Sequence, residues 1–269
     1  MTAHEVRRIV LCADDYGLSP GVSRAIRDLV TRGRINATSA MVVAPSLNPS
    51  EAALLAAGWE WVKQDAYDDA YYRDHMHELP PLIHKERDRM IDVHHTILPL
   101  TARPRPKASV LLEEAVALEK GLYVFSPNPM IIHSATHLMA DGELDGGLRN
   151  LWDIHCLLTE FADEEEDFFL TLAEDACYHG LREPVNRALR LSKNLYGTKL
   201  VAYDGPIKVR YDAKWTDRYF VRRLTARDNW GRGTRKFIRL TFYIRSHWLR
   251  MPPLMLARHL FTKWRKAKG

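Results

Sequence analysis

Cysteine is scarce in this chain, and the few cysteines lie far apart. The 269 residues include only Cys12, Cys156 and Cys177. An odd number of widely separated cysteines argues against a disulfide framework, and the spacing does not fit a zinc knuckle. This usage is typical of a reducing compartment. We therefore expect a cytoplasmic location, with attachment to a membrane surface as the alternative.

Long hydrophobic runs are also absent. No run approaches the ~20 apolar residues that a membrane-spanning helix needs, so we expect no transmembrane segment. The opening MTAHEVRRIVLCADDYG has an acid before its basic pair and two acids after a short apolar run, which is unlike a signal peptide. The hydrophobic content of 46% is ordinary. It allows a packed core in one large domain or in two modest ones.

Acidic residues are rare toward the carboxyl end. Residues 208–269 contain 18 Lys and Arg against 3 Asp and Glu, a balance of +15, whereas the rest of the chain has a balance of −10. Arginines alternate there with aromatic residues, and three interpretations remain open. The segment could bind phosphate-rich partners such as nucleic acid, lie on an anionic membrane as an amphipathic helix over 238–249 and 254–264, or form a solvated basic face over a helical core.

The first part of the chain predicts a β-α-β unit. Residues 7–15 have the pattern of a buried strand, residues 21–32 have helical spacing, and residues 37–43 form a second apolar run. Asp14 and Asp15 come at the carboxyl end of the first predicted strand. Open α/β sheets and barrels place their functional sites at that end.

The run IVLCADDYGLSPGVSRAIRDLVTRGRINATSAMVVAP resembles the opening of the YdjC-like carbohydrate deacetylase family. The resemblance implies a barrel-like α/β fold and metal-dependent removal of N-acetyl groups from sugars. It also implies that Asp14 is the general base and Asp15 a metal ligand. The resemblance ends near Ala57. The histidine-bearing strands that complete the metal site in that family are absent in their usual form.

A single acid within an apolar stretch stands out further along. The segment RMIDVHHTILP, residues 89–99, sets Asp92 between apolar neighbours. A buried acid is costly unless it is compensated, and two interpretations remain open. Asp92 is either a capping or pairing residue at a strand edge, or a ligand for a divalent metal. Residues 82–84 and 90–96 predict a hairpin around it, and residues 58–81 predict a helix or loop.

The segment from 108 to 197 predicts a compact helical region. Gly180 and Gly197 stand where two of the helices should stop, and residues 122–125 are expected to be extended. The predicted helices are residues 108–118, 130–139, 148–161, 168–179 and 183–196.

From Gly58 onward the chain resembles nucleotidyltransferase family proteins of the polymerase-beta superfamily, a branch associated with polysaccharide biosynthesis. The similar runs are YDDAYYRDHMHELPPLIH, IDVHHTILPLTARPRP, MIIHSATHLMADGELDGGLRNLWDIHCLL and RSHWLRMPPLMLARHL. The resemblance implies Mg²⁺-dependent transfer from a nucleoside triphosphate, with Asp92 as the third acid of a metal site. The other two should form a D-x-D pair upstream. Asp14 and Asp15 are no substitute, because adjacent strand residues point to opposite faces.

The sequence therefore predicts a chimera-like chain. We expect an α/β N-terminal β-α-β unit and a small mixed sheet, followed by a mainly α-helical C-terminal domain. The predicted parts are 1–57, 58–106, 107–200 and 201–269. The leading hypothesis is a catalytically incomplete nucleotidyltransferase using Mg²⁺ or another divalent metal, with Asp92 and Asp14 as catalytic and Asp15 and Asp92 as metal-binding residues. The alternatives are a carbohydrate deacetylase acting on a sugar, and a non-enzymatic membrane-peripheral or scaffold protein.

Several other polar residues are expected to be structural. His133 and His137 are four apart, so they share one helix face, but no Glu follows His133 as a metalloprotease motif requires. Asp153 and His155 are expected at the edge of a helical core. Cys12 is expected to be a small buried hydrophobe.

Overall fold

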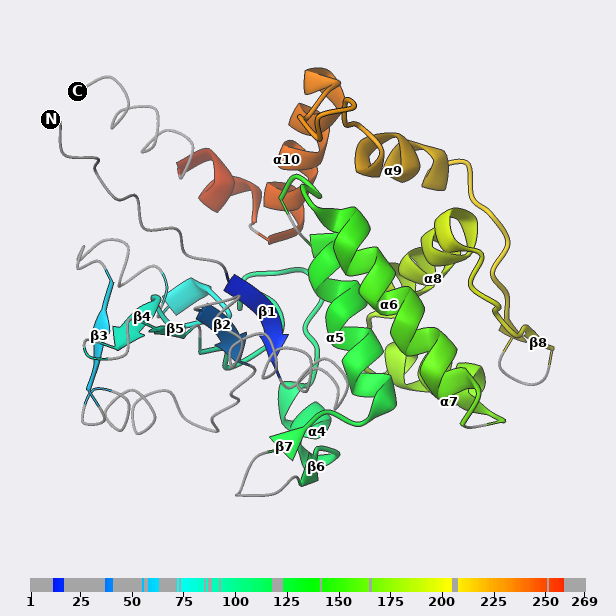
Figure 1. The fold of residues 1–269 in the computed structure, drawn as a ribbon, viewed down its shortest axis with the longest axis horizontal. Helices are drawn as coiled ribbons and strands as arrows, with labels where there is room; N and C mark the ends of the chain where they lie inside the picture. Colours follow the sequence, from blue (N-terminus) through cyan, green and yellow to red (C-terminus); the bar gives the residue numbers. More distant parts are fainter. Residues whose placement is uncertain are drawn as a thin grey trace, which may run out of the picture. The chain divides into compact units, whose positions relative to one another are not determined.

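The chain forms two compact units in a computed structural model. Unit 1 comprises Met1–Thr96 and Ser109–Phe125, and unit 2 comprises Ile97–Ala108 and Ser126–Gly269. Figure 1 shows their elements. The structure describes residues 12–16, 37–40, 55, 58–62, 72, 74–84, 86, 89–91, 93–117, 123–140, 142–164, 166–204, 208–250 and 252–258, with residues 12–16, 37–40 and 89 described by their backbone alone.

The first two strands of unit 1 agree with part of the predicted β-α-β unit. Strand β1 (Cys12–Tyr16) pairs in parallel with β2 (Ala37–Ala40). Parallel neighbours need a crossover connection rather than a tight turn, and the predicted helix over 21–32 would supply it. That helix lies outside the described residues, so the β-α-β unit is confirmed only in its two strands.

A three-stranded antiparallel sheet follows in the order β3-β4-β5. Strands β4 (Leu82–His84) and β5 (Arg89–Ile91) form the predicted hairpin, although β5 is shorter than residues 90–96. Strand β3 (Trp59–Trp61) corrects the expectation of a helix or loop there. The alternation Trp-Glu-Trp is too short to reveal a period, and pairing with β4 decides the conformation.

The small core of unit 1 lies around this sheet. Leu79, Leu82 and Val93 are buried, and Trp59, Trp61 and Ile91 pack against them. The segments on either side of the sheet also pair with each other: the N–H of Leu79 donates to the Val93 carbonyl at 2.8 Å. Val93 comes two residues after β5, so this bond ties the segment that follows β5 to the segment that precedes β4.

Another expectation is corrected where the chain passes between the units. Helix α4 (Ala108–Glu113) ends before residue 118, the predicted end. The next residues form β6 (Val116–Ala117), which pairs antiparallel with β7 (Tyr123–Val124). The predicted extended piece over 122–125 is therefore confirmed. Its pairing with β6 shortens the helix that the amphipathic pattern favoured.

Unit 2 is built around four helices whose predicted positions are confirmed closely. They are α5 (Pro127–Ala140), α6 (Gly147–Ala162), α7 (Phe168–Tyr178) and α8 (Arg182–Tyr196). Helix α5 packs against the other three (Figure 1). Ile131, Ile132 and Ala135 on α5 are completely buried. The helical periodicity in the sequence therefore reflects a shared core.

Two glycines shape the ends of these helices. Gly197 ends α8 in a left-handed conformation with φ of 71°, and its N–H donates to the Lys193 carbonyl. Gly147 begins α6 where a side chain has no room: an added Cβ would lie 2.8 Å from Leu224 and 3.1 Å from Leu138. Gly147 therefore allows the start of α6 to approach its neighbours closely.

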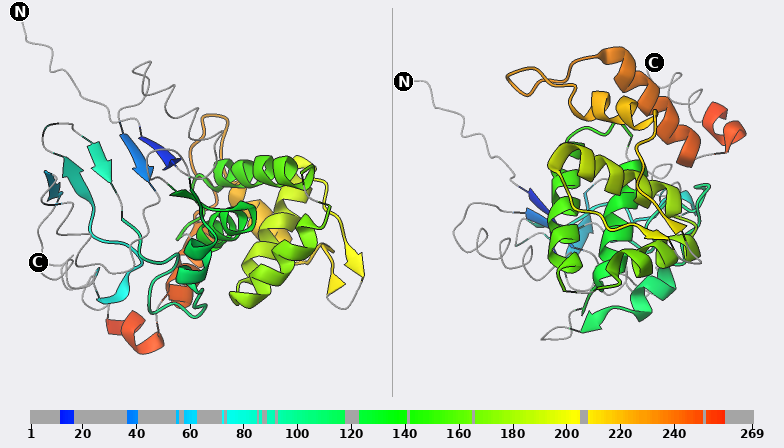
Figure 2. Two further views of the ribbon diagram at one scale, coloured as in Figure 1. Left: turned by 90° about the horizontal axis from the view of Figure 1, so that it is seen from below. Right: turned by 90° about the vertical axis from the view of Figure 1, so that its right-hand side faces the viewer.

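The carboxyl-terminal part of unit 2 adds a hairpin and two helices. Strands β8 (Tyr203–Asp204) and β9 (Lys208–Val209) form a short hairpin that projects from the end of the helical bundle (Figure 2). Helices α9 (Asp217–Leu224) and α10 (Lys236–Arg250) follow. The helix predicted over 238–249 is therefore confirmed. Within the described part of the chain, no helix combines the length and apolar character that crossing a membrane requires.

A buried ion pair joins α8 to α9. The guanidinium of Arg190 donates to both carboxylate oxygens of Asp217, at 2.7 and 3.1 Å, and both residues are about 95% buried. Burial alone would raise the pKa of Asp217, but hydrogen bonds from Arg190 and from the Lys214 backbone outweigh it and hold the pKa below its usual value. Asp217 is therefore a fixed negative charge inside unit 2.

Candidate functional site

The acids singled out in the sequence lie in unit 1. Asp14 and Asp15 are on β1, where the structure describes the backbone only. Asp92 directly follows β5 and lies outside the described residues. Among the described residues of either unit taken by itself, no three His, Cys, Asp or Glu side chains gather as a metal site would require. The catalytic and metal-binding roles of Asp14, Asp15 and Asp92 stay predictions.

The other polar residues singled out in the sequence lie in the helices of unit 2. His133 and His137 stack on one face of α5 with ring centroids 4.4 Å apart, as their spacing predicts. His155 Nδ1 lies 2.8 Å from the Thr198 hydroxyl oxygen, and burial raises the pKa of Asp153. Both residues of α6 are partly buried, which places them at the edge of the core.

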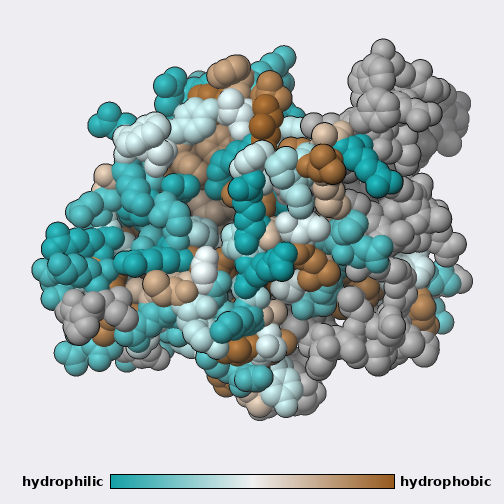
Figure 3. All heavy atoms as spheres, turned by 180° about the vertical axis from the view of Figure 1, so that it is seen from behind, coloured by the Kyte–Doolittle hydropathy of each residue, from teal (hydrophilic) through white to brown (hydrophobic). Residues whose placement is uncertain are grey.

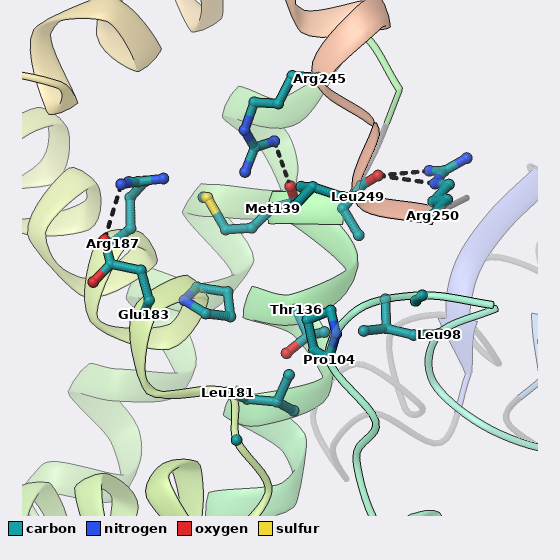
Figure 4. Close-up of a pocket in the computed structure, with 14 residues that line it drawn as sticks. Leu98, Pro104, Thr136, Met139, Leu181, Glu183, Arg187, Arg245, Leu249 and Arg250 are labelled. Atoms are coloured by element: carbon teal, nitrogen blue, oxygen red, sulfur yellow. Dashed lines mark hydrogen bonds and ion pairs between the residues drawn. The ribbon is translucent and has the colours of Figure 1, made fainter. Parts of the chain in front are cut away.

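A cavity of about 380 Å³ opens in unit 2. It lies between α5, the start of α8, the end of α10 and the loop over residues 98–104 (Figure 4). A volume above ~300 Å³ is enough for a small organic ligand. Its walls are mostly apolar, and they include Leu98, Pro104, Met139, Leu181 and Leu249.

Three arginines line this otherwise apolar cavity. They are Arg187 on α8 and Arg245 and Arg250 on α10, and Glu183 is the one acid among the lining residues. Glu183 accepts a hydrogen bond from Arg187 at 2.9 Å and also binds the exposed ammonium of Lys214 at 3.0 Å. Arg187 also lies 3.6 Å from the buried Asp217 carboxylate, so the positive excess among the lining residues rests on Arg245 and Arg250. The cavity therefore carries an excess of positive charge, which favours an anionic ligand.

Arg187 and Arg245 are held close to the same aromatic ring. Their guanidinium carbons lie 4.5 and 5.1 Å from the ring centroid of Phe220 on α9. Phe220 is itself fixed by an edge-to-face contact with Phe242, with centroids 4.9 Å apart. Cations at such distances are attracted by the ring. The two guanidinium groups are therefore positioned before any ligand arrives.

The pKa of Arg245 reflects this crowding of positive charge. Burial and, as the smaller cause, the neighbouring charge of Arg187 together lower it to about 10. Arg245 still carries its charge at neutral pH, because even this value lies well above 7. The charged state is nonetheless less favourable than in water, and an anion bound beside it would offset that cost.

Part of the arginine chemistry serves the fold. Arg250 donates from two nitrogens to the Ala140 carbonyl, at 2.7 and 3.1 Å, and Arg245 donates once to the Met139 carbonyl at 2.8 Å (Figure 4). These carbonyls end α5 and lack partners within the helix. Arg250 is thus mainly a helix cap. A guanidinium has five N–H groups, so Arg245 keeps donors beyond its capping bond.

A buried hydroxyl adds a polar group to the apolar walls. Thr136 on α5 lines the cavity and is 2% exposed. Within the described part of the chain its hydroxyl oxygen has no hydrogen-bond partner. A buried polar group without a partner is costly, so this hydroxyl favours a ligand or water that can bond to it. The cavity can bind an anion with an apolar body, and its lining includes no pair suited to acid–base catalysis.

Sequence reasoning missed the residues of this cavity. The basic balance after residue 208 pointed to the region of Arg245, but it did not distinguish this side chain from the exposed arginines around it. Arg187 is one of several charged residues of α8, and Thr136 is a small polar residue of the largely buried α5, so nothing local marks either. They meet only because α5, α8 and α10 pack together.

Two family models match parts of this chain. Residues 41–197 match the model of a family described as an uncharacterised nucleotidyltransferase. That match covers more than half of the chain. The chain belongs to this nucleotidyltransferase family. Residues 8–61 match a second model, described as YdjC-like protein. No curated protein and no solved structure gives a match.

The two family matches support the chimera-like composition expected from the sequence. The nucleotidyltransferase match includes the sheet β3-β4-β5, the position of Asp92 and helices α5 to α8. The YdjC-like match includes β1 and β2 and overlaps the first match at β3. The cavity draws Thr136 and Arg187 from the matched nucleotidyltransferase region. Arg245 and Arg250 come from the segment beyond residue 197 that completes unit 2.

Proposed function

We propose that this nucleotidyltransferase-family protein binds a nucleoside triphosphate in the cavity of unit 2. The observation that carries the proposal is the pair of guanidinium groups, Arg187 and Arg245, held beside an apolar cavity of about 380 Å³. Guanidinium groups suit phosphate oxygens because they present several donors in one plane. The apolar walls suit the base and sugar, and family membership suggests the ligand class.

The proposed binding does not by itself make the protein an efficient enzyme. Transfer would require an acceptor oxygen to attack the α-phosphorus while pyrophosphate leaves, and two-metal chemistry needs several converging carboxylates. The sequence offers Asp92 no same-face D-x-D partner for such a set. We therefore propose weak or absent transfer, with Mg²⁺ entering mainly as the ion bound to the triphosphate and Asp92 as a remaining acid of the family site.

Equilibrium binding of a fluorescent ATP analogue to the full chain, with and without Mg²⁺, tests the proposal. We expect Arg245→Gln and Thr136→Val each to weaken binding, the first by at least about tenfold because a buried charged contact is lost. The matched control is Arg218→Gln, which removes one positive charge from an exposed position on α9 outside the cavity. Thermal melting shows whether each variant is folded. Equal binding by all four proteins would overturn the proposal.

Carbohydrate deacetylation is the second candidate, favoured by the parallel pairing of β1 and β2 and by the YdjC-like match over residues 8–61. In this proposal Asp15 would hold the metal and Asp14 would accept a proton from bound water. We expect no measurable acetate release from N-acetylglucosamine oligomers with Zn²⁺ or Mg²⁺, because the histidine-bearing strands are missing. Release that disappears in Asp15→Ala would establish the deacetylase instead.

A further inference from the structure

Helix α10 has two apolar sides. One is buried within unit 2, and the other is largely exposed, with the Arg103 guanidinium 4.2 Å from the ring centroid of Trp248. Ile238, Phe242 and Ser246 are at least 92% buried against the rest of the unit. A second set of apolar residues points to solvent at spacings of three and four, which places them in one stripe along the helix. The exposed fractions are 76% for Phe237, 52% for Leu240, 55% for Ile244 and 46% for Trp248.

Basic residues accompany this stripe. Lys236 and Arg239 are exposed on α10. At 3.6 residues per turn Lys236 falls beside the stripe, whereas Arg239 falls nearer Ser246 and pairs with Glu143. Arg232 and Arg235 are exposed just before the helix. In the space-filling view from behind, hydrophobic side chains reach the surface over α10 with hydrophilic ones on both sides (Figure 3).

A rigid turn presents a further aromatic residue in the same region. The backbone N–H groups of Trp230 and Arg232 both donate to a carboxylate oxygen of Asp228, at 2.9 and 2.8 Å. The N–H of Thr234 donates to the Ala226 carbonyl at 2.8 Å and closes the base of the loop. Trp230 is 85% exposed. A turn fixed by these bonds holds a tryptophan in solvent beside arginines.

We propose that α10 and the turn before it dock on an anionic membrane surface. A helix with an apolar stripe and a basic edge lies in the plane of the interface, with its apolar residues among the acyl chains and its cations near acidic headgroups. Tryptophan suits the same depth because its ring is amphipathic. The balance of +15 over residues 208–269 attracts such a surface over a Debye length. This docking site is independent of the proposed nucleotide binding.

A membrane fits this surface better than a nucleic acid does. Three of the four stripe residues are aliphatic or phenyl side chains that cannot hydrogen-bond to phosphate or base edges. Because they are exposed along one side of the helix, transfer into an apolar phase would remove them from water together. Binding to single-stranded nucleic acid relies on aromatic residues that stack on bases within a basic groove. On α10 Lys236 lies beside the apolar stripe instead of within it, and Arg232 and Arg235 precede the helix.

Docking through this stripe leaves the inner side of α10 in place. Arg245 and Leu249 line the cavity of unit 2, whereas Ile244 and Trp248, their neighbours in sequence, are on the outer stripe. The same helix would thus contact the membrane with one side and the bound ligand with the other.

Vesicle co-sedimentation of the full chain tests the proposal, with phosphatidylcholine vesicles against vesicles containing phosphatidylglycerol, at low and at physiological salt. We expect at least tenfold stronger binding to the anionic vesicles, and weaker binding as salt rises. The double variant Phe237→Ser with Ile244→Ser should lose at least tenfold in affinity. The matched control is Val201→Ser with Tyr203→Ser, which removes two exposed apolar side chains of unit 2 outside α10.

The other outcomes are equally informative. Equal affinity for both kinds of vesicle, or no binding at low salt, overturns the proposal. So does wild-type affinity in the stripe variant, because the apolar residues would then not enter the bilayer. Salt-sensitive binding to single-stranded RNA without vesicle binding would assign the surface to nucleic acid. Thermal melting of the stripe variant should match that of wild type, since both replaced side chains are exposed.

Discussion

Unit 2 and unit 1 differ in how their polar groups are compensated inside the fold. In unit 2, Arg190 pairs with Asp217, which also lies 3.6 Å from Arg187, and the carbonyls at the end of α5 are capped by Arg245 and Arg250. In unit 1 the described core contains Leu79, Leu82 and Val93 on a small sheet, and the acids that would act chemically lie beside it in the sequence. Unit 2 thus compensates these charges and carbonyls internally, whereas unit 1 holds the acids to which the sequence assigns the catalytic roles.

The largest effect should come from breaking the buried ion pair of unit 2. Asp217→Asn removes the charge that compensates Arg190, and breaking one partner of a buried pair costs about 3–5 kcal/mol. Urea denaturation measures the change in the free energy of unfolding. The control is Asp204→Asn, because the pair of Asp204 with Arg210 is exposed and such pairs contribute about 0–1 kcal/mol. Similar losses in both variants would contradict the distinction between the two pairs.

Core truncations in the two units sharpen the comparison. Ile132→Ala in unit 2 and Leu82→Ala in unit 1 each remove a side chain that is 0% exposed, and such changes cost about 2–5 kcal/mol. We expect the larger loss for Ile132→Ala, because α5 is enclosed by three helices that cannot all collapse into the cavity. Hydrogen exchange followed by mass spectrometry reads each unit separately. A larger loss of protection from Leu82→Ala would reverse the comparison.

A smaller effect should appear with pH. Burial lowers the pKa of His179; the charge of Lys107 also lowers it, whereas the charge of Asp175 raises it. The Nδ1 atom of His179 accepts a hydrogen bond from the Lys107 backbone at 3.3 Å. A folded-state pKa below the unfolded value means that this contribution to stability is present above about pH 6.5 and is lost as pH falls through the folded pKa. Wild type should therefore lose more stability than His179→Gln between pH 7.5 and 5.5. Equal losses in urea denaturation would contradict this.

The smallest change in stability is expected from Asp92→Asn. The sequence predicts a partly exposed acid at the end of a small sheet, and neutralising such a group changes the unfolding free energy by no more than about 0.5 kcal/mol. Transfer of labelled nucleotide to protein or small acceptors, with Mg²⁺ or Mn²⁺, is the second readout. Robust transfer that Asp92→Asn abolishes would show that other acids complete the site, and unit 1 would then be a working catalytic unit.

The helices of unit 2 could be predicted because their signals are long and local. Over residues 148–161 and 183–196 the apolar period is sustained for several turns, and Gly197 marks a stop that the structure confirms. The β4–β5 hairpin was also predicted from two short apolar runs and a charged turn. Strand β3 was not, because three residues carry too little pattern to outweigh the mixed segment around them.

The cavity could not be predicted for a different reason. Arg187 and Arg245 are far apart in the sequence, and each lies in a helix whose pattern only separates a buried side from a solvated one. Their meeting depends on the packing of α8 and α10 around Phe220. The sequence indicated the chemistry of this region through its positive balance. It did not indicate which side chains turn inward.

The pairing of Arg190 with Asp217 also decides where a shorter version of the protein can end. A fragment cut at residue 197, the limit of the family match, would retain Arg190 and discard its counterion. It would also expose the Met139 and Ala140 carbonyls that α10 covers. The smallest expressible form of unit 2 should therefore extend through Arg250.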